Sequence, residues 1–139
     1  MVVGAVAWFA IATLIDILAR LLWPAYADAV AAFRRAMEAP GAATGGAMIF
    51  TLEMMLARLA EGAIASIGAG FTLACIARGN RSAAIVLGAL IIALFVPIHY
   101  AVWNRFPVWY HLVFLLSLLP LTVIGAALAQ RPKSPVSLR

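Results

Sequence analysis

The stretch SAAIVLGALIIALFVPIHYAVW (residues 82–103) contains no Asp, Glu, Lys or Arg from end to end. A helix that crosses the hydrocarbon core of a bilayer needs about 20 predominantly apolar residues in a row. The stretch also lacks the alternation of apolar and polar positions that is typical of a membrane-spanning β-strand. It therefore predicts a transmembrane α-helix.

The composition of the whole chain agrees with a membrane protein. Of its 139 residues, 66% are hydrophobic and 11% are charged, and the mean hydropathy is +1.07. A soluble domain is nearer half apolar and a quarter charged, so a water-soluble fold of this size could not hide so much apolar surface. Abundant Ala and Arg beside a single lysine, Lys133, indicate a bacterial chain and hence the inner (cytoplasmic) membrane.

Three further apolar blocks are long enough to span a membrane. We predict spans at about 2–23, 57–77, 82–103 and 107–129. Since only short connections separate them, we expect an all-α bundle of four transmembrane helices that forms one domain, residues 1–130, followed by a disordered basic tail, residues 131–139. We expect the first span to be retained rather than cleaved as a signal peptide, because no positive charge precedes it and Asp16 and Arg20 lie within it.

The segment AYADAVAAFRRAMEA (residues 25–39) between the first two spans has a different pattern. Tyr26, Val30, Phe33 and Met37 recur at helical spacing on one face, and the charged residues lie elsewhere around the helix. This pattern predicts a short amphipathic helix in the membrane interface. Such a helix is either a lid over a site below it or a connector with its apolar face in lipid.

Small residues follow one face of the second span. Gly62, Ser66 and Gly70 recur every four residues, a spacing that lets another helix approach closely. We expect this face to pack against a neighbouring helix. The spacing leaves open whether that helix belongs to the same chain or to a second copy.

The polar residues of the four predicted spans gather near one membrane face. Because successive spans cross in opposite directions, the ends of the first and third meet the starts of the second and fourth. At a rise of about 1.5 Å per residue, most of these residues lie within about 10 Å of that face. Since ionisable groups in a bilayer are costly, the set is a candidate polar site. Its members are Asp16, Arg20, Arg58, Glu61, His99, Tyr100, Tyr110 and His111.

Two pairs within this set have the spacing of helical ion pairs. Asp16 precedes Arg20 by four residues, and Arg58 precedes Glu61 by three. Side chains at these separations are neighbours on a helix, so we expect both pairs to form. On this interpretation the charges are structural, and the aromatic residues of the turn HYAVWNRFPVWYH (residues 99–111) anchor the membrane interface.

Functional alternatives remain for the same residues. His99, His111 and a carboxylate have the ligand types of a metal site, although their spacing matches no known signature. Two histidines at equal depth on antiparallel helices would also suit haem. Otherwise Asp16 or Glu61 would carry a proton in a small transporter, or the set would bind a quinone-like molecule. From the sequence we assign neither a metal site nor a cofactor.

The chain has no Walker loop, nucleophile elbow or HExxH motif, and its one cysteine, Cys75, lies in an apolar block. We therefore expect a non-enzymatic membrane protein, a subunit or accessory of a membrane assembly; the alternative is a small transporter or ligand-binding protein. Its expected partners are the lipid bilayer and a second copy or another membrane protein, but not nucleic acid. The distribution of Arg and Lys favours cytoplasmic N- and C-termini, which puts the polar set in the outer leaflet.

Overall fold

The computed structural model describes residues 1–38, 49–77 and 81–130. In these ranges the chain forms five α-helices and a 3-10 turn at Trp103–Arg105, with no strand. The helices are α1 (Val2–Leu22), α2 (Pro24–Glu38), α3 (Leu52–Ile76), α4 (Arg81–Ala101) and α5 (Val108–Leu128). Four of them, α1, α3, α4 and α5, contain segments long and apolar enough to cross a membrane. The predicted all-α fold class with four spanning helices is thus confirmed.

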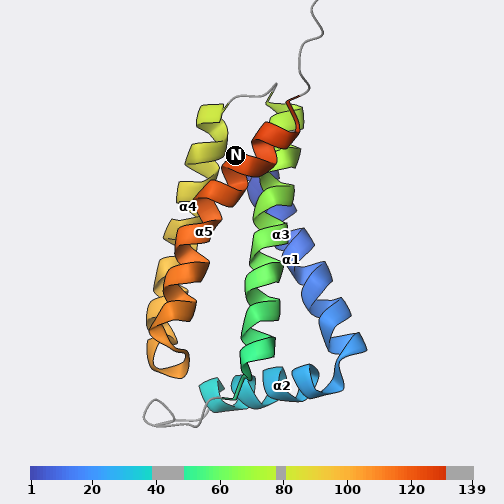
Figure 1. Ribbon diagram of the computed structural model, residues 1–139, viewed down its shortest axis with the longest axis vertical. Helices are drawn as coiled ribbons and strands as arrows, with labels where there is room; N and C mark the ends of the chain where they lie inside the picture. Colours follow the sequence, from blue (N-terminus) through green and yellow to red (C-terminus); the bar gives the residue numbers. More distant parts are fainter. Residues whose placement is uncertain (39–48, 78–80, 131–139) are drawn as a thin grey trace, which may run out of the picture.

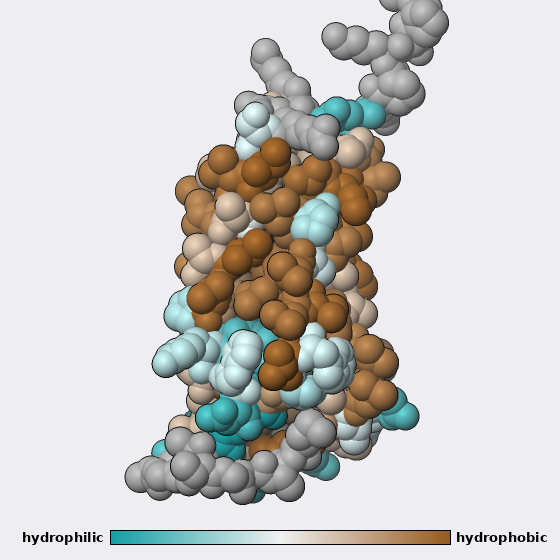
Figure 2. Space-filling model, turned by 60° about the vertical axis from the view of Figure 1, so that its left-hand side comes forward, coloured by the Kyte–Doolittle hydropathy of each residue, from teal (hydrophilic) through white to brown (hydrophobic). Residues whose placement is uncertain are grey.

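The four long helices run along the length of the molecule, and α2 lies across one end of them (Figure 1). Figure 2 shows hydrophobic side chains over most of that length, with hydrophilic residues gathered toward the end that α2 covers. Leu14 and Leu116, for example, are 58% and 72% exposed. Large apolar side chains exposed to this extent fit a surface that faces lipid.

The helix boundaries differ slightly from the predicted spans. The chain leaves α1 at Trp23 and starts α2 at Pro24, a residue that suits a first helical turn. Helix α3 starts at Leu52, before the predicted span, where the hydroxyl of Thr51 accepts a hydrogen bond from the Met54 amide at 3.4 Å. The predicted tail, residues 131–139, lies outside the described residues.

Helix α3 is central, and its small-residue face packs against α5 of the same chain. A Cβ atom added to Gly70 would lie 1.9 Å from the backbone oxygen of Thr122, and one added to Gly125 would lie 2.0 Å from that of Ile67. The two backbones therefore touch where each helix has a glycine. This contact answers the question that the Gly62, Ser66 and Gly70 spacing left open, since the neighbour is intramolecular.

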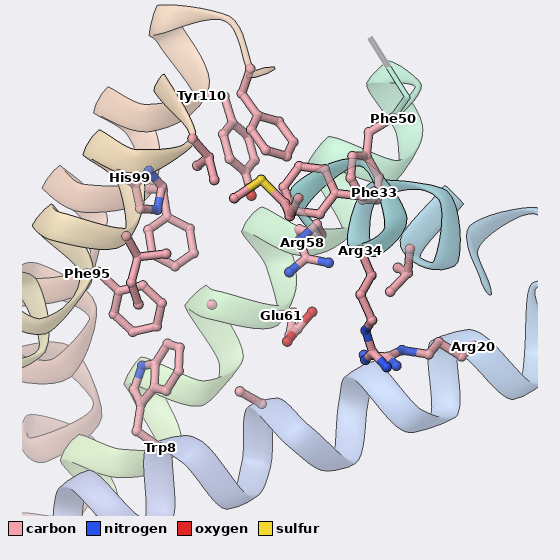
Figure 3. A pocket seen from close by; sticks show the side chains of 18 residues that line it. Trp8, Arg20, Phe33, Arg34, Phe50, Arg58, Glu61, Phe95, His99 and Tyr110 are labelled. Carbon is pink, nitrogen blue, oxygen red and sulfur yellow. The ribbon is translucent and has the colours of Figure 1, made fainter. Parts of the chain in front are cut away.

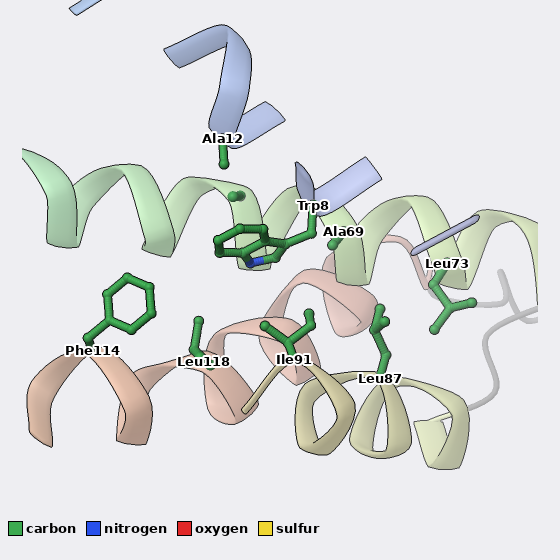
Figure 4. Close-up of a cluster of buried hydrophobic side chains, with 9 residues drawn as sticks. Trp8, Ala12, Ala69, Leu73, Leu87, Ile91, Phe114 and Leu118 are labelled. Carbon is green, nitrogen blue, oxygen red and sulfur yellow. The ribbon is translucent and has the colours of Figure 1, made fainter. Parts of the chain in front are cut away.

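Helix α1 is joined to α3 by a buried hydrogen bond. The Nε1 atom of Trp8 donates to the Ser66 hydroxyl at 3.0 Å, and that hydroxyl donates to the Gly62 carbonyl at 2.7 Å. Both polar groups are thus satisfied away from water. Around Trp8, a buried apolar cluster fills the centre of the bundle (Figure 4); it also contains Ala12, Ala65, Ala69, Leu73, Leu87, Ile91, Phe114 and Leu118.

Helix α2 packs on the end of the bundle through two buried side chains. Tyr26 is 1% exposed and Ala29 is 8% exposed. They belong to a second buried cluster with Phe50, Met54, Met55 and Tyr110, which lie at the start of α3 and of α5. Helix α2 therefore covers the space between the four long helices at this end of the bundle.

Candidate functional site

A pocket of about 460 Å³ lies beneath α2, and all five helices contribute to its walls (Figure 3). Aromatic rings form much of the lining, and charged side chains enter from α1, α2 and α3. The lining residues are Trp8, Ala12, Arg20, Val30, Phe33, Arg34, Met37, Phe50, Arg58, Glu61, Gly62, Phe95, Ile98, His99, Val102, Phe106, Tyr110 and Phe114.

Most of the polar residues that the sequence analysis singled out meet at this pocket. Arg20, Arg58, Glu61, His99 and Tyr110 line it directly. They come from α1, α3, α4 and α5, which are distant in sequence but adjacent in the bundle. These residues therefore lie at a similar depth along the spans, and their side chains all face the space under α2.

The other three predicted residues are placed differently. Asp16 lies beside the pocket, where it pairs with Arg20, and His111 is fully buried behind His99. Tyr100 does not belong to the group, since its side chain is 82% exposed. The reason is helical geometry: one residue after the inward-facing His99, the helix has turned by about 100°.

Tyr26 of α2 connects the charged residues of α1 and α3. The Nη1 atom of Arg58 donates to the Tyr26 hydroxyl at 2.9 Å, and that hydroxyl donates to a carboxylate oxygen of Asp16 at 3.2 Å. The other oxygen of Asp16 accepts a hydrogen bond from Arg20. A continuous chain of polar contacts thus holds α2 against the two spanning helices.

The predicted Arg58–Glu61 ion pair is wrong, whereas the Asp16–Arg20 pair is confirmed. Arg58 instead turns toward α2, where it bonds Tyr26 and its guanidinium lies 5.6 Å from the centre of the Phe50 ring. A helical spacing of three residues permits a pair but does not enforce it. Here a hydrogen-bond acceptor and an aromatic ring from elsewhere in the chain take the place of the carboxylate.

Tyr26 is a site residue that the sequence pattern does not single out. The helical spacing puts Tyr26 with the apolar residues of α2, which agrees with its buried ring but gives its hydroxyl no role. A buried phenol needs a hydrogen-bond partner. This requirement could have identified Tyr26 from the sequence, because its hydroxyl is the one polar group among Tyr26, Val30, Phe33 and Met37.

The environment of Tyr26 changes its titration. Burial, together with the Asp16 carboxylate and against the opposing effect of Arg58, raises the pKa of Tyr26 to about 12 from an ordinary value of 10.0. A phenol whose pKa is higher in the folded state than in the unfolded state destabilises the fold only as the pH rises above the unfolded pKa. Tyr26 therefore keeps its proton, and its bond to Asp16, at and well above neutral pH.

We expect the difference between the ultraviolet absorbance titrations of the wild-type protein and Tyr26→Phe to show one phenol with a midpoint near pH 12. The stability advantage of the wild type should shrink as the pH rises from 10 toward 12. Tyr100→Phe is the matched control, because that side chain is exposed. A Tyr26 midpoint near 10 would mean that its hydroxyl is not held as described.

Glu61 is the unusual group of the pocket. Its carboxylate points into the space (Figure 3), and within residues 1–38, 49–77 and 81–130 it makes no hydrogen bond and no ion pair. It sits in a helix that is long and apolar enough to span a membrane. An ionised carboxylate in such a place is costly unless something compensates it. Arg58 and Arg20 act on Glu61 through space, but no hydrogen bond satisfies its oxygens within the described residues.

The two histidines contact each other directly. The Nδ1 atoms of His99 and His111 are 2.8 Å apart, and the Nε2 atom of His111 lies 3.2 Å from the carbonyl oxygen of Trp103. Two ring nitrogens at hydrogen-bond distance leave no room for an iron between them, so this pair does not have the geometry of two axial haem ligands. Among the described residues, no three His, Cys, Asp or Glu side chains cluster closely enough to hold a metal ion.

The aromatic residues of the turn divide into two groups. Tyr110 faces the pocket and is 5% exposed, whereas Trp103 and Trp109 are 40% and 39% exposed. Tyr110 therefore belongs to the site, and the two tryptophans remain available for the interface-anchoring role that the sequence predicts.

Comparisons with known protein families, curated proteins and solved structures find no match to this chain. The function must therefore be inferred from the chemistry of the pocket and from the fold that forms it.

Proposed function

We propose that this chain is a multi-pass membrane protein that binds a small amphiphilic molecule in the pocket beneath α2. The observation that carries the proposal is the Glu61 carboxylate, which faces the pocket from a spanning helix and makes no hydrogen bond or ion pair among the described residues. A ligand with a hydrogen-bond donor would supply that partner. On this proposal the site is completed by the molecule that it binds.

The size and lining of the pocket support a ligand with an apolar body. Its volume of about 460 Å³ falls within the range of small-molecule sites, which are mostly apolar with a few placed polar groups. Trp8, Phe95 and Phe114 form a continuous set of ring contacts on one wall, with centroids 4.8 Å and 5.2 Å apart. Arg20, Arg34 and Arg58 lie on the α1, α2 and α3 walls.

Binding fits the contacts better than the accessory role that the sequence also suggests. The Gly62, Ser66 and Gly70 face favours association with a second copy or a partner, and α5 and α1 of the same chain already cover this face. If the protein moves its ligand across the membrane, Glu61 rather than Asp16 is the proton-carrying group, since Asp16 is held by Arg20 and Tyr26. We further propose the bacterial inner membrane, on the abundance of Ala and Arg beside a single lysine, with cytoplasmic termini, on the distribution of the Arg and Lys residues.

The test is a binding isotherm in lipid nanodiscs, corrected with empty nanodiscs, for a neutral, an anionic and a cationic amphiphile: 4-hexylresorcinol, 1-anilinonaphthalene-8-sulfonate and tetraphenylphosphonium. We expect saturable one-to-one binding of at least one probe. Ala12→Phe, which places a large ring in the lining, should weaken that binding at least tenfold.

Leu14→Phe is the matched control, because residue 14 is 58% exposed on the same helix and should leave binding unchanged. Glu61→Gln, which has the same shape as the wild-type residue, provides a second variant if Ala12→Phe does not fold. Absence of saturable binding for all three probes, or equal binding by wild type and both pocket variants, would rule the proposal out.

A further inference from the structure

The contacts of His111 determine which of its nitrogens carries a proton. A carbonyl oxygen only accepts hydrogen bonds, so the Nε2 atom of His111, 3.2 Å from the Trp103 carbonyl, must be the donor. A neutral imidazole has one N–H, and its other nitrogen is an acceptor. In neutral His111 the Nδ1 atom is therefore the acceptor.

The same reasoning extends to His99. Its Nδ1 atom lies 2.8 Å from Nδ1 of His111, and a hydrogen bond between the two needs one donor. Since His111 accepts at this position, His99 must carry its proton on Nδ1. The Nε2 atom of neutral His99 then has a lone pair and no proton.

Two neutral rings satisfy both hydrogen bonds of this arrangement. His111 is 0% exposed and His99 is 6% exposed, and no hydrogen bond joins either ring to a carboxylate in the described part of the chain. Arg58, another cation, lines the same pocket. A positive charge on the pair would be buried without a partner, which is costly.

We propose that His99 Nε2 is a hydrogen-bond acceptor of the pocket, and that together with Glu61 it selects a ligand with a phenol-type hydroxyl group. This inference rests on the proposed function and names the class of ligand. The pocket then has two acceptors, one on α4 and one on α3, which make no hydrogen bond at these atoms in the described residues and which a donor on the ligand can reach. A hydroxyl group on an apolar ring meets this requirement.

The surroundings favour a neutral ring over an amine. Three arginines line the pocket, so a cationic ammonium donor would be repelled, whereas a neutral hydroxyl would not. Beside the His99 ring, Phe114 lies 4.7 Å and Phe95 lies 6.4 Å away between centroids. A ligand ring whose hydroxyl reaches His99 would lie against these aromatic side chains.

The first test measures the tautomers without any ligand. Long-range ¹H–¹⁵N spectra of the wild-type protein should show His111 protonated on Nε2 and His99 protonated on Nδ1. In His111→Phe, where His99 Nδ1 no longer has the His111 acceptor, His99 should change to an Nε2–H form. If His99 of the wild type carries its proton on Nε2, it presents a donor to the pocket and the inference is wrong.

The second test compares 4-hexylresorcinol with its dimethyl ether, which has nearly the same shape but no hydroxyl donor. We expect the ether to bind about tenfold more weakly or worse, because buried acceptors lose their partners. In His99→Phe, which keeps a ring of similar outline, this ratio should fall toward one.

The outcomes separate the inference from the proposed function. Equal binding of the resorcinol and its ether would overturn the acceptor role while leaving a ligand-binding pocket in place. Binding of neither compound, together with failure of the other two probes, would remove both. If His99→Phe does not fold, the tautomer spectra of the wild-type protein still decide the inference.

Discussion

Replacing Gly70 by alanine is expected to lower the free energy of unfolding by about 3 kcal/mol, at the upper end of the range for overpacked cores. The added Cβ would lie 1.9 Å from the Thr122 carbonyl oxygen and 2.8 Å from its carbon. Both atoms belong to the backbone of α5, so no side-chain rotation relieves the clash. The two helices must separate, which loosens the bundle along its most closely packed contact. Unfolding in mixed detergent–SDS micelles measures the effect.

Gly68→Ala is the control for this result. It makes the same substitution on the same helix, and the nearest obstacle, at 2.5 Å, is the terminal methyl group of Ile11. A flexible side-chain end can move aside, and alanine favours the helix over glycine. We expect a change within about 1 kcal/mol. Similar losses in both variants would mean that the α3–α5 backbone contact is not the source of the effect.

Replacing Arg58 by methionine is expected to cost about 2–3 kcal/mol. The change removes a charged hydrogen bond to the Tyr26 hydroxyl and the contact of the guanidinium with the Phe50 ring. It also leaves Glu61 without a cation on its own helix in the pocket. The measurement is the same SDS unfolding curve, together with hydrogen–deuterium exchange of α2, which should speed up as its attachment to α3 weakens.

Arg34→Met is the matched control, since Arg34 also lines the pocket but is exposed and makes no hydrogen bond or ion pair in the described residues. We expect its stability and its α2 exchange to stay close to those of the wild type. If the two methionine variants behave alike, the Arg58–Tyr26 contact does not hold α2 in place.

The sequence predicted the fold class because apolar length is a property of each helix alone. It also placed most of the polar residues at one end of the bundle, because alternating spans fix relative depth. Which helices contact one another, and through which faces, depends on the tertiary structure. The spacing of Gly62, Ser66 and Gly70 marks a face for close approach but not the helix that covers it, and the structure supplies α5.

The errors in the predicted site have the same origin. Arg58 bonds Tyr26 instead of Glu61 because α2 folds back over the bundle, and no pattern within α3 contains that information. Depth along the span groups Tyr100 with His99, yet a helix turns adjacent side chains in different directions. Trp8, Phe95 and Phe114 form one aromatic wall only in the folded bundle, because they come from three different helices and have no common pattern in the sequence.

Photolabelling with a diazirine derivative of 4-hexylresorcinol, mapped by peptide mass spectrometry, tests most directly whether the pocket beneath α2 is a ligand site. We expect labels on the pocket-facing side chains of α1, α4 and α5, among them Trp8, Phe95 and Phe114, and we expect excess unlabelled 4-hexylresorcinol to displace them. Labels confined to outward-facing residues such as Leu14 and Leu116, unaffected by the competitor, would show partition into the surrounding lipid and contradict a binding site in this pocket.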